Sequence, residues 1–163
     1  MNSGAVLYVE DEQDDIFLVR HAFKQAGISN ALIALADGEA ALDYLKGRGM
    51  YSNRSEHPVP ILLLLDINMP LVSGLEVLKW VRSQTALRAL PALMLSSSSQ
   101  PSDIRSAYEL GANGYLVKPS ALAKLLTMVE SIRDYWLLQN QPPPDFEDAL
   151  PLKPEMNDLN LEI

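Results

Sequence analysis

An unbroken apolar run at residues 61–65 ends directly at Asp66. A strand with one face in solvent alternates apolar and polar residues, whereas a strand that is buried on both faces does not alternate. Residues 61–65 are therefore predicted to form the central strand of a sheet covered on both sides. Such a strand is typical of a mostly parallel sheet between two layers of helices.

The rest of the chain repeats this alternation of apolar runs and helical segments. Further strands are predicted at residues 5–9, 31–35, 92–95 and 115–117, and helices at about 14–26, 37–45, 74–83, 101–111 and 120–139. Segments with helical periodicity between short apolar strands predict parallel βαβ units. The predicted class is α/β, a doubly wound (βα)₅ domain with a five-stranded parallel sheet.

Two polar segments interrupt or follow this pattern. Residues 46–60 contain glycine and proline and are predicted to be a long surface loop, away from the chemistry. Residues 141–163 carry six acids and one base and begin with a run of prolines. The expected organisation is a domain at 1–140 and an acidic, proline-rich tail at 141–163.

Composition excludes several classes of site and partner. The chain has no cysteine, which excludes disulfides, thiolate metal sites and cysteine nucleophiles. Its formal net charge of −8 disfavours nucleic-acid backbones, and the 23 residues of the tail are too few for a DNA-binding module. No signal peptide or membrane-spanning run is evident, so a cytoplasmic location is expected.

Polar side chains follow four of the predicted strands, at the point where each strand ends: Glu10 and Asp11, Asp66, Ser96, and Lys118. The carboxyl ends of parallel strands meet at one edge of a sheet, where such proteins bind their ligands. Neighbouring carboxylates repel one another unless a cation binds them, and oxygen ligands favour Mg²⁺. One carboxylate could then act as a nucleophile toward a phosphoryl group, with a lysine and a hydroxyl stabilising its oxygens.

Four motifs in this order resemble those of a response-regulator receiver domain, a CheY-like fold of two-component signalling. They are Val9-Glu10-Asp11, Leu65-Asp66-Ile67-Asn68-Met69-Pro70 with Gly74, Leu95-Ser96, and Gly114-Tyr115-Leu116-Val117-Lys118-Pro119. The resemblance covers roughly residues 4–140. It implies a protein that catalyses its own phosphorylation and dephosphorylation rather than an enzyme acting on other molecules.

The resemblance also implies residue roles. Asp66 is the phosphoacceptor; Asp11, Asp66 and the backbone carbonyl of Asn68 bind Mg²⁺, and Glu10 supports the ion through water. Ser96 and Lys118 contact the phosphoryl group. Ser96 and Tyr115 form the switch, and the Lys118–Pro119 peptide is expected to be cis.

The loop at 45–53 and the helix end at 134–137 are similar to those of small stand-alone regulators paired with bacterial, especially cyanobacterial, phytochromes. That similarity implies a sensor histidine kinase, of the phytochrome type, as phosphoryl donor. The apolar helix end with Tyr135 and Trp136 suggests a homodimer or a tail that folds back. Output is expected through protein contacts or phosphorelay.

Two other functions stay open. A phosphohydrolase with an aspartyl nucleophile would need an acid two residues later, but Asn68 stands there. A pseudo-receiver would only dock partners. Asp14 and Asp15 are expected to be ordinary solvated acids at a helix start, and His21 and His57 to be surface residues.

Overall fold

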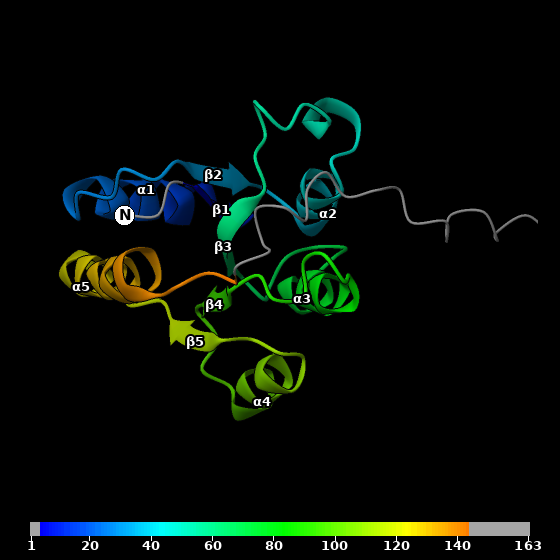
Figure 1. The fold of residues 1–163 in the computed structure, drawn as a ribbon. Helices are drawn as coiled ribbons and strands as arrows, with labels where there is room; N and C mark the ends of the chain where they lie inside the picture. Colours follow the sequence, from blue (N-terminus) through cyan, green and yellow to red (C-terminus); the bar gives the residue numbers. More distant parts are fainter. Residues whose placement is uncertain (1–3, 144–163) are drawn as a thin grey trace, which may run out of the picture.

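The sheet predicted from the alternating pattern is present in the computed structural model, which describes residues 4–143 (Figure 1). Five parallel strands lie in the order β2-β1-β3-β4-β5. The strands are β1 (Ala5–Val9), β2 (Leu32–Leu35), β3 (Pro60–Leu65), β4 (Ala92–Ser96) and β5 (Gly114–Val117); the helices are α1 (Gln13–Gln25), α2 (Gly38–Lys46), α3 (Gly74–Ser83), α4 (Pro101–Glu109) and α5 (Leu122–Ile132). The predicted fold class is confirmed.

Helices cover both faces of the sheet. Helices α1 and α5 lie side by side on one face, and α2, α3 and α4 lie on the other (Figure 1). The central strand β3 contributes Leu63 and Leu65 to the core under α2 and α3, and Leu62 and Leu64 to the core under α1 and α5. Leucine on both sides of the pleat explains why this segment does not alternate.

The strand registers bring the strand ends to the same level. Val9 of β1 pairs with Leu65 of β3, and Leu65 pairs in turn with Met94 of β4. The residues that follow β1 and β3, Glu10 and Asp66, are therefore neighbours across the sheet. The backbone N–H of Asp66 donates to the carbonyl of Val9 at 3.1 Å and continues the ladder by one step.

Three helices begin at residues that are typical of helix starts. Asp37 caps α2, because its Oδ1 accepts from the backbone N–H of Ala40 at 2.7 Å. Pro101 stands in the first turn of α4, where its missing N–H is not needed. Ser73 and Glu76 form a capping box at the start of α3.

The last helix differs from its prediction. A single helix was expected over 120–139, but α5 ends at Ile132 and the chain continues as a π-helix, η2 (Arg133–Gln139). The wider turn, with i→i+5 hydrogen bonds, changes which residues face the core. Leu137 is fully buried, while Tyr135 and Leu138 remain 54% and 47% exposed.

The long loop between α2 and β3 is ordered by its own contacts. It contains a short 3₁₀ turn, η1 (Gly49–Tyr51). The Arg54 guanidinium donates to the carbonyls of Tyr44 and Leu45 at 2.7 Å and of His57 at 3.2 Å, so it satisfies the last turn of α2. The ring of His57 packs against Tyr44 and Tyr51 at centroid distances of 5.9 and 5.3 Å. These rings half-bury His57, so this predicted surface residue has ring contacts that the sequence did not indicate.

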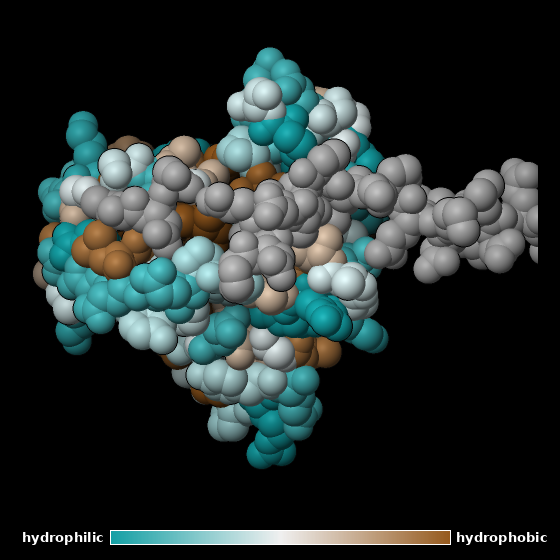
Figure 2. Space-filling model, in the orientation of Figure 1, coloured by the Kyte–Doolittle hydropathy of each residue, from teal (hydrophilic) through white to brown (hydrophobic). Residues whose placement is uncertain are grey.

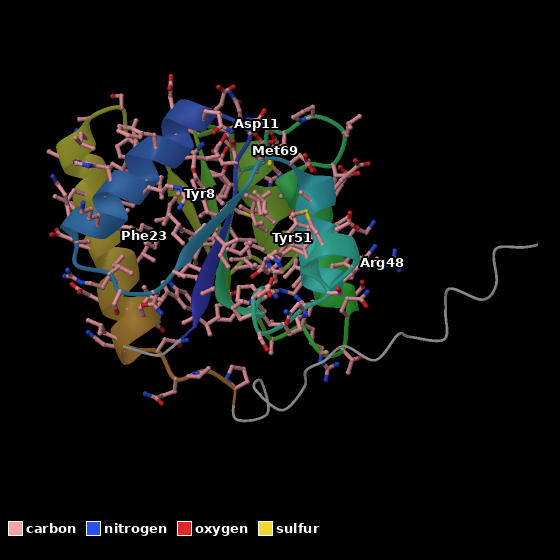
Figure 3. All side chains as sticks on the ribbon, turned by 90° about the horizontal axis from the view of Figure 1, so that it is seen from above. Tyr8, Asp11, Phe23, Arg48, Tyr51 and Met69 are labelled. Atoms are coloured by element: carbon pink, nitrogen blue, oxygen red, sulfur yellow. The ribbon has the colours of Figure 1, made fainter. Side chains whose placement is uncertain are left out.

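The predicted position of this loop can be followed in Figure 3. Arg48 and Tyr51 lie at the α2 side of the molecule, away from Asp11 at the end of β1. The face in Figure 2 is mostly hydrophilic, with apolar residues gathered around α5 and the seam between α1 and α5. No helix among residues 4–143 is both long and apolar enough to cross a membrane. The expected tail lies, from residue 144 onward, outside the described residues.

Candidate functional site: an acidic pocket with one lysine

Three carboxylates meet at the carboxyl edge of the sheet. Glu10 and Asp11 follow β1 and Asp66 follows β3, and each offers a carboxylate oxygen within 4.8 Å of the other two. Figure 3 shows Asp11 at this end, together with Met69 from the loop after β3. The sequence prediction that these acids converge agrees with this geometry.

The pocket leaves carboxylate oxygens without partners. Glu10 and Asp66 are buried, at 0% and 4% exposure, and Asp11 is half-buried. Within residues 4–143, Oδ1 of Asp11 and Oδ1 of Asp66 are buried and accept no hydrogen bond. A buried carboxylate oxygen without a donor is unfavourable, and a hard divalent cation would satisfy both oxygens at once. The donor set therefore fits Mg²⁺ or a similar ion.

Lys118 reaches into the pocket from the residue after β5. Its backbone N–H donates to the carbonyl of Ser96 at 2.8 Å, which extends the ladder between β4 and β5. Its ammonium contacts Glu10 Oε2, and lies 2.8 Å from Asp15 Oδ2 and 3.4 Å from Asp66 Oδ2. The lysine side chain is only 10% exposed, so these contacts are partly shielded from water.

Asp15 joins the site, and the prediction of a plain solvated acid at this position is wrong. It lies in the first turn of α1 and is half-buried, whereas Asp14 beside it is exposed. Its place in the first turn of α1 follows from the sequence, but its distance to Lys118 depends on how α1 lies against the sheet. That placement is a tertiary property.

Burial dominates the electrostatics of Glu10. It raises the pKa of this carboxyl to about 7, against the opposing effects of the Lys118 ammonium and the Glu12 N–H. The hydroxyl of Tyr8 donates to Glu10 Oε2 at 3.1 Å, and burial followed by the Glu10 charge raises the pKa of Tyr8. Burial alone would lower the pKa of Lys118, but hydrogen bonds to Asp15 and Glu10 raise it on balance. The lysine therefore stays a cation.

A second group of contacts links the end of β4 to α4 and β5. Ser96, the last residue of β4, is fully buried, and its Oγ accepts from the backbone N–H of Ser98 at 3.3 Å. The Ser98 hydroxyl donates to Asp103 in the first turn of α4. The hydroxyl of Tyr115 on β5 donates to the carbonyl of Ser98 at 2.9 Å. Ser96 and Tyr115, both predicted as switch residues, are thus joined through Ser98.

Two predicted features have no contact that tests them. Asn68 is exposed two residues after Asp66, and the role of its carbonyl as a metal ligand stays a prediction. A cis peptide between Lys118 and Pro119 also stays a prediction.

The charges of the pocket determine what it can bind. Four carboxylates face a single ammonium, so the pocket repels anions such as phosphoryl groups. A divalent cation held by Glu10, Asp11 and Asp66 would offset this repulsion, and the Lys118 ammonium could then pair with an incoming oxygen. The arrangement suits nucleophilic attack by a carboxylate on phosphorus.

Known proteins match this chain in sequence over most of its length. Response regulator Rcp1 of Synechocystis sp. is 39% identical over 132 residues, which cover 81% of this chain and 88% of Rcp1. The probable methanogenesis regulatory protein FilR2 of Methanothrix harundinacea is 37% identical over 138 residues, which cover 85% of this chain and 86% of FilR2.

Solved structures extend the likeness to three dimensions. The Mn²⁺-bound form of Rcp1 matches with a TM-score of 0.78 at 37% identity, covering 86% of this chain and 99% of that structure. The phosphorylated cyanobacterial phytochrome response regulator RcpA matches with a TM-score of 0.81 at 32% identity, covering 87% and 99%. The predicted CheY-like receiver fold is confirmed, as is the similarity to phytochrome-associated regulators. Residues 6–130 match the family model of the response regulator receiver domain, so the chain belongs to that family of phosphorylation-dependent signalling proteins.

Proposed function

We propose that Asp66 accepts a phosphoryl group and that the chain signals by the resulting change in its surface. The observation that carries this proposal is a buried Asp66 carboxylate with an unpartnered Oδ1, beside two further acids and 3.4 Å from the Lys118 ammonium. The family of the chain supports the same role.

Mg²⁺ is the proposed cofactor, with Asp11, Asp66 and the Asn68 carbonyl as ligands and Glu10 acting through water. When bound, the ion supplies positive charge that offsets repulsion between the carboxylates and the phosphoryl oxygens. A divalent ion is present in the Mn²⁺-bound form of Rcp1, which supports a cation in this chain.

The proposed step is an in-line displacement at phosphorus. A carboxylate oxygen of Asp66 forms a bond to phosphorus as the bond from phosphorus to the donor nitrogen of a phosphohistidine breaks. The product is an acyl phosphate, and the departing imidazole nitrogen takes up a proton. Lys118 and the Ser96 hydroxyl stabilise the phosphoryl oxygens.

The proposed donor is a sensor histidine kinase of the phytochrome type. The likeness to RcpA, a phytochrome response regulator, supports this pairing. Output is proposed to occur in the cytoplasm through protein contacts or phosphorelay, without DNA binding. A homodimer through the helix end at Tyr135 and Trp136 is part of the same proposal, because Tyr135 is exposed there.

Intact-mass measurement after incubation with acetyl phosphate tests the phosphoacceptor. One added phosphate is expected in the wild type with Mg²⁺, and none in Asp66→Asn or in EDTA. Absence of labelling in the wild type, with Mg²⁺ present, would favour a pseudo-receiver that only docks partners. Steady turnover of phosphate esters would favour a phosphohydrolase instead.

The donor is tested separately. Phosphorylated phytochrome kinases and unrelated histidine kinases are compared at equal concentration as phosphoryl donors to the wild-type chain. Faster transfer from a phytochrome kinase is expected. Equal transfer from all kinases would contradict the proposed pairing and leave the phosphoacceptor intact.

A further inference from the structure

The Lys118 ammonium has three acceptors, and they are not equivalent. Glu10 and Asp66 belong to the group of carboxylates that could hold a metal ion, together with Asp11. Asp15 does not belong to that group, yet its Oδ2 lies 2.8 Å from the ammonium, closer than the 3.4 Å to Asp66 Oδ2. Asp15 is thus the acceptor that a bound cation leaves to the lysine.

An ammonium has three N–H donors on a flexible stem of four carbons. In this structure Glu10, Asp15 and Asp66 surround it, so a donor is available for each. The contact to Asp15 helps to direct another donor toward Asp66, where the phosphoryl group is attached in the proposed function. Without the contact to Asp15, the Lys118 side chain would be more mobile. The entropic cost of fixing it would then add to the barrier for phosphoryl transfer.

We propose that Asp15 is a positioning residue for phosphoryl transfer, acting through Lys118: it holds the ammonium beside Asp66 while the other carboxylates bind the cation. This inference rests on the proposed function of Asp66. Asp15 is assigned no contact with the phosphoryl group or the metal, so its effect should depend on the lysine.

A simpler reading is that Asp15 is one of two acids that favour the N-terminus of α1 through the helix dipole. Asp14 offers a matched control, because it lies in the same turn with the same charge. It is exposed, and no hydrogen bond or ion pair of its side chain occurs among residues 4–143. Asp14→Asn and Asp15→Asn therefore change the net charge and the helix end alike, but only the second removes a contact to Lys118.

The test measures the rate of Asp66 phosphorylation by acetyl phosphate at saturating Mg²⁺. Asp15→Asn is expected to slow labelling by about 5- to 10-fold, the scale of the net contribution of one typical hydrogen bond. Asp14→Asn should label at the wild-type rate, and Asp15→Glu should recover part of the loss. The Mg²⁺ concentration for half-maximal labelling should stay within about twofold of wild type, because Asp15 is not a proposed ligand.

A double-mutant comparison gives the decisive readout. In a Lys118→Ala background, Asp15→Asn should have no further effect on the residual labelling rate, because Asp15 is proposed to act only through the Lys118 ammonium. An equal slowing in both backgrounds, or a wild-type or faster rate for Asp15→Asn with Lys118 present, would overturn the inference. Thermal melts verify that each variant is folded at the assay temperature, and Asp15→Glu provides the test if Asp15→Asn is not.

Failure of the underlying proposal has a different signature. If wild type is not labelled at all, Asp66 is not a phosphoacceptor under these conditions and the inference about Asp15 falls with it. If wild type is labelled at Asp66 and the variants of Asp15 behave like those of Asp14, only the positioning role is lost.

Discussion

Individual side chains at the site combine burial with charge. Glu10 is fully buried, contacts the Lys118 ammonium and accepts from the hydroxyl of Tyr8. A carboxyl group in these surroundings keeps its proton to a higher pH than a carboxyl group in water. The acidity of the pocket is thus a property of its packing as much as of its composition.

The stability of the metal-free protein should depend on the protonation of Glu10. Because burial raises the pKa of Glu10 from 4.5 to about 7, the folded state holds a proton that the unfolded state loses. The contribution of this proton to stability is present below about pH 4.5 and is lost as the pH rises through about 7. Urea midpoints in EDTA should therefore fall less between pH 5 and 8 for Glu10→Gln than for wild type; identical slopes would contradict the raised pKa.

Gly74 sets how closely α3 approaches the proposed phosphoacceptor. A Cβ at this position would lie 1.9 Å from the backbone oxygen of Asp66, so Gly74→Ala must displace backbone. We expect a loss of about 2–4 kcal/mol in the free energy of unfolding, together with slower phosphorylation. Urea unfolding measures the first quantity. Gly49→Ala is the control, since Gly49 has φ +57 but open space around it, and should cost about 1 kcal/mol.

Secondary-structure elements meet the site at their ends, where loops join them. The β4–α4 loop is held by bonds at Ser98 that join Ser96, Asp103 and Tyr115. A hydroxyl that turns from Ser98 toward a phosphoryl oxygen would break the first of these bonds. Ser98, which also contacts Asp103 of α4 and Tyr115 of β5, would then be released from the end of β4.

Tyr115→Phe tests this link in the unphosphorylated protein. Removal of the hydroxyl deletes the 2.9 Å bond to the Ser98 carbonyl, a contribution of about 1 kcal/mol. We expect amide hydrogen exchange in residues 97–103 to speed up several-fold while labelling of Asp66 by acetyl phosphate continues. Unchanged exchange would mean that the bond does not restrain the loop. Loss of labelling and of partner response together in Tyr115→Ala would count against a switch role.

The α2–β3 loop is stabilised by Arg54 and should be independent of the chemistry. Arg54→Ala leaves carbonyls of Tyr44, Leu45 and His57 without their donor, and should lower the free energy of unfolding by about 1–3 kcal/mol. Arg54→Lys keeps the charge but loses the planar fork, so it should recover only part of the loss. Urea unfolding measures both variants. Both variants should be phosphorylated at the wild-type rate per folded molecule. A lower rate per folded molecule would show that the loop is not independent of the chemistry.

The whole molecule exposes apolar groups at the end of its last helix. Tyr135 and Leu138 are exposed on η2 while Leu137 anchors this segment to the core. If the proposed homodimer forms here, sedimentation of the wild type should give a dimer with or without beryllofluoride. Replacing both Tyr135 and Leu138 with serine should weaken it at least tenfold. A wild-type monomer in both conditions would remove the proposal.

Sequence patterns predicted most of the fold, because the decisive signals were local. The bounds of β1 and α3 agree with those predicted from the apolar run and the helical periodicity. The convergence of Glu10, Asp11, Asp66 and Lys118 follows from parallel topology. The π-helical turn was not predictable, since its choice over an α-turn depends on which side chain best fills the core beside α1.

Two side chains have contacts that the sequence did not indicate, for the same reason. Asp15 and His57 each lie in a segment that was predicted correctly, as a helix start and a loop. Asp15 contacts Lys118, which is distant in the chain. His57 contacts the rings of Tyr44 and Tyr51 because the loop folds back on itself. Such contacts depend on the angle of one element against another, which local periodicity does not specify.

The strand order has a mechanical consequence. The acids follow β1 and β3, each of which is hydrogen-bonded to a strand on both sides, whereas Lys118 and Tyr115 belong to β5 and its end, at the border of the sheet. Displacing an inner strand would rupture two ladders, but displacing β5 would strain only its ladder with β4. The acids of the proposed ion and phosphate site are thus carried by strands that are paired on both sides, and β5, held by a single ladder, is the strand that a small local change would move most readily.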